Sequence, residues 1–307
     1  MKKARDMAAA AVRAPVGARQ LHTGRFLPVL TVTLAILAIW YLGAVWLNAP
    51  QVIDRYDDQP WTWQQLVQDS WSMERPVLPA PHQVAEEFNK TVFQTAITSK
   101  RSLVYHAWIT LSATLLGFAL GTLLGILLAV GIVHMRILDR ALLPWVIASQ
   151  TIPILAIAPM VVVVLGSVGL TGLVPKSLIS MYLCFFPITI GMVKGLRSPD
   201  VLSLELMHTW NATPAQVFWK LRWPAAVPFL FASLKVAIAI SLVGAIVGEM
   251  PTGAQAGIGA RLLSGSYYGQ TVQIWAALVM GSVMAGLLIA VVSAAERFTL
   301  RAMGARP

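Results

Sequence analysis

The sequence predicts an all-α, polytopic membrane protein with six transmembrane helices. Of the 307 residues, 57% are hydrophobic and only 12% are charged, which is about half the charged fraction of an ordinary soluble domain. The mean hydropathy of +0.70 points the same way. The apolar residues also form stretches of about 20 or more, long enough to cross the hydrocarbon core of a bilayer as helices. Composition therefore favours a membrane domain over soluble ones.

Six apolar stretches are candidates for these helices, and they cover residues 26–47, 104–132, 141–165, 171–193, 226–248 and 272–294. The third and fourth are separated only by residues 166–170, which predicts a tight turn at one membrane face. Prolines inside the stretches remove amide donors, so each predicts a bend, either as a packing kink or as part of a bundle around a cavity. They are Pro144, Pro153, Pro159 and Pro187.

The first 25 residues are basic and precede the first predicted span. The apolar core of that span is longer than the core of a secretory signal peptide, about 7–15 residues, and no small-residue cleavage site follows it. We therefore interpret residues 1–25 as a cytoplasmic tail and 26–47 as an uncleaved transmembrane helix. A transit peptide is the alternative for residues 1–25, because they are rich in Arg and poor in acidic residues.

The distribution of charge predicts the orientation of the chain. Lys and Arg mark the cytoplasmic side of a membrane protein, and they are more frequent in the two ends and around residues 194–222 than in the segments between. Residues 48–103 hold more than half of the 13 acidic residues and form a predicted periplasmic segment. Both termini are then cytoplasmic, with a membrane domain over residues 104–296 and a short tail over 297–307.

One predicted span carries a small residue at every fourth position. These residues are Ala113, Gly117, Gly121, Gly125 and Ala129. They form a flat ridge along one helix face, which lets a second helix backbone approach closely. The ridge predicts helix packing around Gly117, Gly121 and Gly125, and it says nothing about a substrate.

The sequence lacks motifs for chemistry on a substrate. The string from Gly172 to Ser177 lacks the second glycine of a phosphate-binding loop, and neither an HExxH pair nor a GxSxG elbow occurs. The five histidines have no metal-ligand spacing. The net charge of +10 is not gathered into one stripe, so nucleic acid is not an expected partner. We expect no catalytic residue, no cofactor and no metal site.

A polar segment over residues 201–224 has the most informative local pattern. Residues 201–210 predict a short helix, and Thr213 as N-cap with Pro214 behind it predicts a second one. Asn211 lies between them, where a left-handed backbone is expected and Asn is tolerated.

The same segment is expected to end at Pro224 and Pro228, which would stop the second helix and start the next span. Its aromatic side chains suggest a surface that docks onto a partner. They are Trp210, Phe218, Trp219 and Trp223.

The segment resembles the EAA loop of binding-protein-dependent ABC importer permeases. That loop begins E-A-A-x-x-x-G and closes on I-x-L-P; here Glu205 holds the glutamate place, Asn211 holds the glycine place and residues 221–224 (LRWP) hold the closing string. The chain departs from the pattern at Asn211 and at the two alanines. The resemblance implies that a set of residues couples the chain to an ATPase subunit, namely Glu205, Leu206, Met207, Asn211, Ala212 and Thr213.

Further strings resemble the nitrate, sulfonate and taurine permease subfamily. They are residues 78–81 (LPAP), 185–187 (FFP), 194–196 (KGL), and 247–249 (VGE) followed by 257–259 (GIG). The resemblance implies a type I ABC importer permease fold in the bacterial inner membrane. It also implies two ATPase subunits, a periplasmic substrate-binding protein and a second copy of the permease as partners. ATP hydrolysis would then take place on the separate ATPase subunit.

Two charged residues are candidates for the solute pathway or its gating. Lys235 lies within a span and either snorkels toward the cytoplasm or lines the pathway. Glu249 lies at the end of a span, where it either anchors the external loop or gates the solute. The alternative functions are a proton-coupled secondary carrier, which would transport without an ATPase, and a polytopic membrane enzyme. The resemblance implies nitrate, a sulfonate, taurine or a pyrimidine-type precursor as solute.

Overall fold

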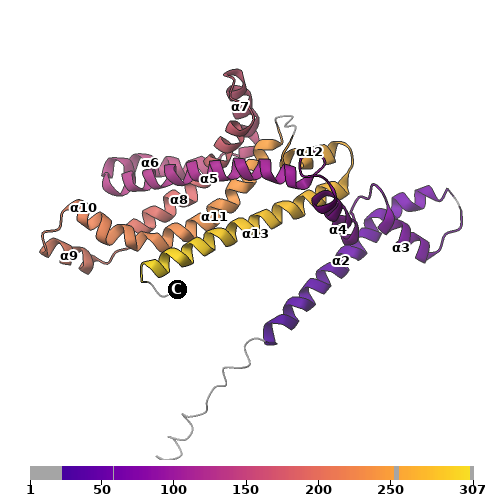
Figure 1. The fold of residues 1–307 in the computed structure, drawn as a ribbon, viewed down its shortest axis with the longest axis horizontal. Helices are drawn as coiled ribbons and strands as arrows, with labels where there is room; N and C mark the ends of the chain where they lie inside the picture. The colour runs from indigo at the N-terminus through magenta and orange to yellow at the C-terminus, as the bar shows by residue number, and fades with distance from the viewer. Residues whose placement is uncertain (1–22, 58, 252–255, 305–307) are drawn as a thin grey trace, which may run out of the picture. The chain divides into compact units, whose positions relative to one another are not determined.

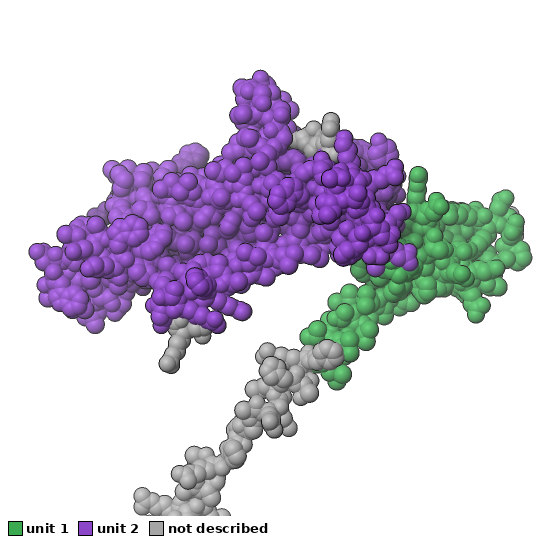
Figure 2. All heavy atoms as spheres, in the orientation of Figure 1, with its two compact units in different colours: residues 1–83 green, residues 84–307 purple. Residues whose placement is uncertain are grey.

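The computed structural model describes residues 23–57, 59–251 and 256–304, and these residues form helices, turns and loops without a strand. The chain divides into two compact units, residues 1–83 and 84–307, which Figure 2 colours separately. The expected all-α fold is therefore confirmed for the described residues.

The first unit contains a long apolar helix and a short amphipathic one. Helix α2 (Thr23–Arg55) continues past the predicted end of the first span. Helix α3 (Trp63–Ser72) begins at a capping box, in which Thr62 accepts a hydrogen bond from the Gln65 amide. Between the two helices, the Tyr56 hydroxyl donates to Asp69 Oδ2 at 2.6 Å, and this bond raises the pKa of Tyr56 to about 12.

A buried asparagine fixes the chain that follows α3. Asn48 has no exposed surface. Its Nδ2 donates to the carbonyls of Ser70 and Leu78, and its Oδ1 accepts from the amides of Val77 and Leu78. A side chain in the last third of α2 thus pairs with backbone groups of α3 and of the loop after it, and its own amide is satisfied as a buried amide must be.

Long and short helices make up the second unit (Figure 1). They are α4 (Pro81–Asn89), η1 (Lys90–Gln94), α5 (Leu103–His134), α6 (Arg136–Ala148), η2 (Ser149–Thr151), α7 (Ile154–Ser167), α8 (Leu173–Leu196), α9 (Val201–Thr209), α10 (Pro214–Val217), η3 (Phe218–Arg222), α11 (Trp223–Glu249), α12 (Ile258–Tyr267) and α13 (Thr271–Ala302). In Figure 1, α9 and α10 lie at one end of this unit and α12 at the other.

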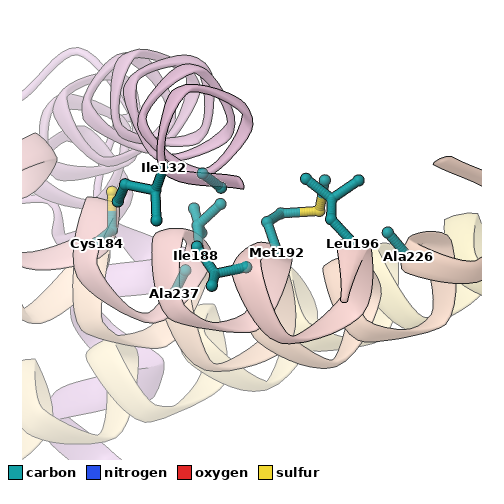
Figure 3. Close-up of a cluster of buried hydrophobic side chains, with 9 residues drawn as sticks. Ile132, Cys184, Ile188, Met192, Leu196, Ala226 and Ala237 are labelled. Atoms are coloured by element: carbon teal, nitrogen blue, oxygen red, sulfur yellow. The ribbon is translucent and has the colours of Figure 1, made fainter. Parts of the chain in front are cut away.

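Helices α5, α8 and α11 form the centre of the second unit, and α13 packs against α11 and α12. The glycine ridge of α5 faces α8: a Cβ atom on Gly117 would lie 2.7 Å from the Ser177 carbonyl oxygen, and one on Gly125 would lie 2.9 Å from the Phe185 carbonyl oxygen. A cluster of buried apolar side chains fills the same interface, and Figure 3 shows Cys184, Ile188 and Met192 among them.

Five described helices are long and apolar enough to cross a membrane, and a sixth crossing requires α6 and α7 together. The predicted span over 141–165 is broken, and the bend expected at Pro153 is one of 100° between α6 and α7. Pro153 is the cause: its ring disfavours helical backbone in the preceding residue, and Ile152 is extended. Pro144, Pro159 and Pro187 lie inside helices that continue past them.

The prediction that the second short helix of the 201–224 segment stops at Pro224 is wrong. Pro224 lies in the first turn of α11, and the helical chain runs from Pro214 to Glu249 without a break. A proline inside a helix normally leaves a carbonyl without its amide partner. Here η3 is a π-helical segment, in which the Trp223 amide donates to the Phe218 carbonyl, five residues back. This wider turn precedes the proline, and the helix passes through it and continues beyond Pro228.

Candidate functional site

The 201–224 segment has the local structure that its sequence predicts. Asn211 has a φ of 53°, in the left-handed region. The amide of Asn211 donates to the His208 carbonyl and that of Ala212 to the Met207 carbonyl, which satisfies the last carbonyls of α9. Thr213 then caps α10 in a capping box with Gln216.

The outer surface of this segment exposes several large apolar side chains. Val201, Leu202, Leu206, Trp210 and Trp219 are each between 49% and 75% exposed. Glu205, Asn211 and Thr213 are exposed as well, whereas Met207 and Ala212 are half-buried. Contiguous exposed apolar surface of this kind marks an interaction site.

The inner side of the segment is attached to the helix bundle. Phe218 and Trp223 pack against the buried cluster between α5, α8 and α11. The ring of Phe218 meets that of His134, at the end of α5, with centroids 5.3 Å apart. Arg222 donates to the Leu196 carbonyl at the end of α8. A displacement of the segment would therefore act directly on the ends of α5 and α8.

At the opposite end of the unit, Glu249 is fully buried and bonded to other elements. The Thr110 hydroxyl on α5 lies 3.0 Å from both carboxylate oxygens of Glu249, and the Gly259 amide donates to Oε2 at 2.9 Å. Lys176 Nζ, on α8, lies 3.7 Å from Oε1. Glu249 thus joins α5, α8, α11 and the start of α12.

The N-terminus of α12 is held by side chains from α5 in the same way. The Ile258 amide donates to Thr110 Oγ1, and the Gly257 amide donates to His106 Nδ1, both at 2.9 Å. Since Nδ1 accepts, Nε2 carries the hydrogen and donates to the Lys100 carbonyl. Gly257 has a φ of 128°, and a Cβ atom there would collide with the Glu249 carboxylate. The backbone amides at a helix start have no partner within the helix. Here those of Gly257, Ile258 and Gly259 all donate to side chains.

A cleft of about 730 Å³ lies beside this buried network. Its lining comes from α5, α7, the turn before α8, the first turn of α8 and Ala256. Lys176 belongs to both the cleft and the network: it is 7% exposed, and its Nζ donates to the Ala256 carbonyl at 3.1 Å. The volume lies in the range of small-molecule sites, about 300–1,000 Å³.

Lys235 lies away from this cleft and has a partner that the sequence did not predict. Its Nζ forms an ion pair with Glu296 Oε2 on α13. The Lys235 side chain is 34% exposed and that of Glu296 19%. The pair lies nearer the end of the unit that holds α9 and α10, since Glu296 precedes the end of α13 by less than two turns.

Sequence reasoning singled out Glu249 but missed its partners. The patterns around Lys176, His106 and Thr110 carry no functional interpretation. Thr110 is 139 residues from Glu249 along the chain, so no local pattern connects them. One signal could have indicated a partner: Glu249 lies at the end of an apolar helix, and a buried acid requires a partner.

Comparison with known proteins identifies the family. Residues 121–304 match the model of the binding-protein-dependent transport system inner membrane component. The chain belongs to this family of ABC transporter permeases. The permease is 31% identical to a probable ABC transporter permease protein of Haemophilus influenzae, over 68% of this chain and 83% of that one.

Two further relatives have names that include a solute. The permease is 34% identical to the formylaminopyrimidine transport permease protein ThiX of Halalkalibacterium halodurans, over 60% of this chain and 68% of that one. It is 32% identical to the riboflavin transport system permease protein RibX of Chloroflexus aurantiacus, over 61% and 65%. Family and apolar helices together make the chain a multi-pass inner-membrane transport subunit rather than an enzyme.

Proposed function

We propose that the permease forms the translocation path for a small solute in an importer that contains two ATPase subunits, a periplasmic binding protein and a second copy of the permease. The observation that carries the proposal is the 201–224 segment, which is exposed and apolar outside and attached to α5 and α8 inside. ATP-driven closure of the ATPase pair would move this segment and, through it, the bundle. Access to the path then alternates by rigid-body motion, without covalent chemistry on the solute.

Within the segment, we propose that Glu205, Leu206, Met207, Asn211, Ala212 and Thr213 dock onto the ATPase. The family resemblance and the exposed turn at Asn211 support this assignment. Docking onto a cytoplasmic ATPase requires α9 and α10 to lie in the cytoplasm. Both termini would then lie in the cytoplasm too, and α12 with the cleft would lie at the periplasmic face. Lys and Arg are most frequent where that orientation requires them.

The decisive experiment measures ATP hydrolysis by the transporter reconstituted in vesicles with its ATPase, and its stimulation by loaded binding protein. Glu205→Ala and Asn211→Val should each abolish most of the stimulation while the subunits still assemble. Glu86→Ala, which removes an exposed acid on α4, is the matched control and should behave as the parent. Full stimulation in both segment variants would show that another surface couples the permease to ATP.

Orientation and copy number have tests of their own. With Cys184 replaced, a cysteine at Asp57 should react with an impermeant thiol reagent in intact cells, and a cysteine at Trp210 should not.

Native mass spectrometry should detect two identical permease chains per transporter. A secondary carrier, the alternative function, would instead take up solute when the permease is reconstituted alone.

For the solute, we propose a small heterocycle of the pyrimidine-precursor or riboflavin type over nitrate or a sulfonate. The relatives named for formylaminopyrimidine and riboflavin, at 34% and 32% identity, support this choice. Uptake of a labelled aminopyrimidine, riboflavin, nitrate and taurine, each with the binding protein encoded beside the permease, tests it directly. Uptake of nitrate or taurine alone would contradict it.

A further inference from the structure

The cleft beside Glu249 has a single ionisable side chain among its described lining residues, namely Lys176. The other lining side chains are mostly apolar and include Ile109, Val162, Leu173 and Pro175. A fixed positive charge in such a cleft would attract anions strongly, because the apolar walls keep water from screening it. Whether Lys176 presents that charge to a solute therefore decides which solutes the cleft can accept.

The structure shows that the charge of Lys176 is offset by an acid. Glu249 Oε1 lies 3.7 Å from Nζ, and the Ala256 carbonyl accepts a hydrogen bond from Nζ at 3.1 Å. The carboxylate cannot move toward another partner, because the Thr110 hydroxyl and the Gly259 amide hold both of its oxygens. The lysine and the glutamate together contribute no net charge to the cleft.

The hydroxyl group of Ser112 does not replace that charge. Ser112 Oγ donates its hydrogen to the Ile109 carbonyl at 2.8 Å, within its own helix. An anion that leaves water for this cleft would thus find no unpaired cationic side chain among the described lining residues to offset its desolvation. A planar, uncharged molecule loses far less on the same transfer.

We propose that the cleft admits an uncharged, largely apolar solute, and that Glu249 sets this selectivity by neutralising Lys176. The proposal rests on the proposed transport function and takes the cleft as part of the solute path. It assigns Glu249 and Lys176 together as specificity-determining residues: Glu249 acts through Lys176, and Lys176 is the one that lines the cleft.

The test measures the electrostatic potential of the cleft directly, without transport or an ATPase. A cysteine at Ser112, with Cys184→Ser as background, is modified in unsealed membrane fragments by an anionic and a cationic methanethiosulfonate reagent of similar size. The ratio of the two rates is normalised to the ratio at Tyr268→Cys, which lies on an exposed turn. A neutral cleft gives a normalised ratio within about threefold of one.

Three variants in the same background sharpen the result. Glu249→Gln keeps the side-chain shape but leaves Lys176 unpaired, and should shift the ratio toward the anionic reagent by about tenfold. Lys176→Gln should shift it toward the cationic reagent. The double variant Lys176→Gln/Glu249→Gln is the matched control, uncharged again, and should return the ratio to that of the parent.

The parent measurement keeps the proposal falsifiable if a variant fails to fold. A parent cleft that favours the anionic reagent by more than about tenfold would overturn it, and so would a Ser112→Cys side chain that neither reagent reaches. An unchanged ratio in a folded Glu249→Gln protein would remove Glu249 from the selectivity. Loss of coupling through the 201–224 segment affects ATP hydrolysis and leaves these rates unchanged, so failure of one proposal is separable from failure of the other.

Discussion

The two ends of the second unit differ in which side chains they bury and which they expose. At the α12 end, charged and polar groups are buried: Glu249 has no exposed surface and Lys176 is 7% exposed. At the α9 and α10 end, large apolar groups are exposed, with Trp210 at 70% and Leu202 at 75%. Figure 1 shows that the long helices of the bundle connect these two ends.

The contrast indicates what each end is built to do. A buried polar group lowers stability unless its partners are present, so a satisfied buried network holds its elements in one arrangement. An exposed apolar surface is unfavourable in water and indicates a partner that covers it. The buried network at the α12 end therefore has its partners within this chain, whereas the exposed apolar side chains of the α9 and α10 end indicate a partner outside it. Substitutions should then affect folding in the buried network and coupling to the partner at the α9 and α10 end.

The largest expected effect is that of Glu249→Ala on stability. The change leaves the Gly259 amide without an acceptor and the Lys176 ammonium without its counterion, and breaking a buried ion pair on one side costs about 3–5 kcal/mol. Glu205→Ala removes an exposed acid at the other end and should change stability by less than about 0.5 kcal/mol. Thermal unfolding of the full chain in detergent compares the two, and similar melting temperatures would contradict the contrast between the ends.

The next effect concerns the packed helices that connect the two ends. Gly117→Ala places a Cβ atom 2.7 Å from the Ser177 carbonyl oxygen on α8, and overpacking of this kind costs about 1–3 kcal/mol. Gly286→Ala on α13 is the matched control, since nothing lies within 4 Å of its new Cβ. That change should be neutral or should stabilise the helix by up to about 1 kcal/mol. An equal loss of melting temperature in both variants would mean that α5 and α8 are not packed closely.

The spans and the 201–224 segment could be predicted because their signals are local. Hydropathy finds an apolar helix from a run of neighbours, and the glycine ridge of α5 follows from a four-residue spacing within one helix. Asn211 followed by Thr213 and Pro214 specifies a turn and a helix start within four residues. Each of these features depends on residues that are close in sequence, so no knowledge of the fold is required.

The remaining features depend on contacts that are distant in sequence or on competition between neighbours. Glu249 finds Thr110 across 139 residues, and nothing near either residue encodes that meeting. At Pro153 and Pro224 the same residue type had opposite outcomes, a 100° bend at the first and an uninterrupted helix at the second. The difference comes from the π-helical turn before Pro224, which hydropathy cannot reveal.

A smaller effect is expected at the turn of the exposed end. Asn211→Val puts a β-branched residue at a φ of 53°, a strain of about 1–2 kcal/mol that is confined to the loop. Asn211→Gly, which restores the residue of the EAA pattern, removes the strain and should be neutral. Limited proteolysis should cleave the valine variant faster near residue 211 while the melting temperature of the bundle stays the same. If Asn211→Val lowered the melting temperature as much as Glu249→Ala does, the loop at the α9 and α10 end would contribute to the stability of the whole bundle, contrary to this prediction.

The smallest expected effect on stability belongs to Lys235 and Glu296, which join α11 to α13. Both side chains are partly exposed, and a pair of this kind contributes about 1 kcal/mol or less. Lys235→Gln and Glu296→Gln should each lower the melting temperature slightly. The exchange Lys235→Glu/Glu296→Lys should recover most of the loss, because the attraction does not depend on which helix carries which charge. If the exchanged double variant lost as much stability as the two single variants together, the ion pair would contribute nothing.

The same exchange distinguishes the two roles considered for Lys235. If the lysine only neutralises Glu296 between two helices, the exchanged pair should restore uptake along with stability. If the lysine lines the solute path, uptake should stay low although the melting temperature recovers, because the charge now extends from α13. The structural role is favoured here: the partner on α13 accounts for the charge of Lys235, whereas Lys176 and not Lys235 lines the cleft beside Glu249. Recovered stability with abolished uptake would therefore move the charge-sensitive part of the path from the α12 end toward the end that holds α9 and α10.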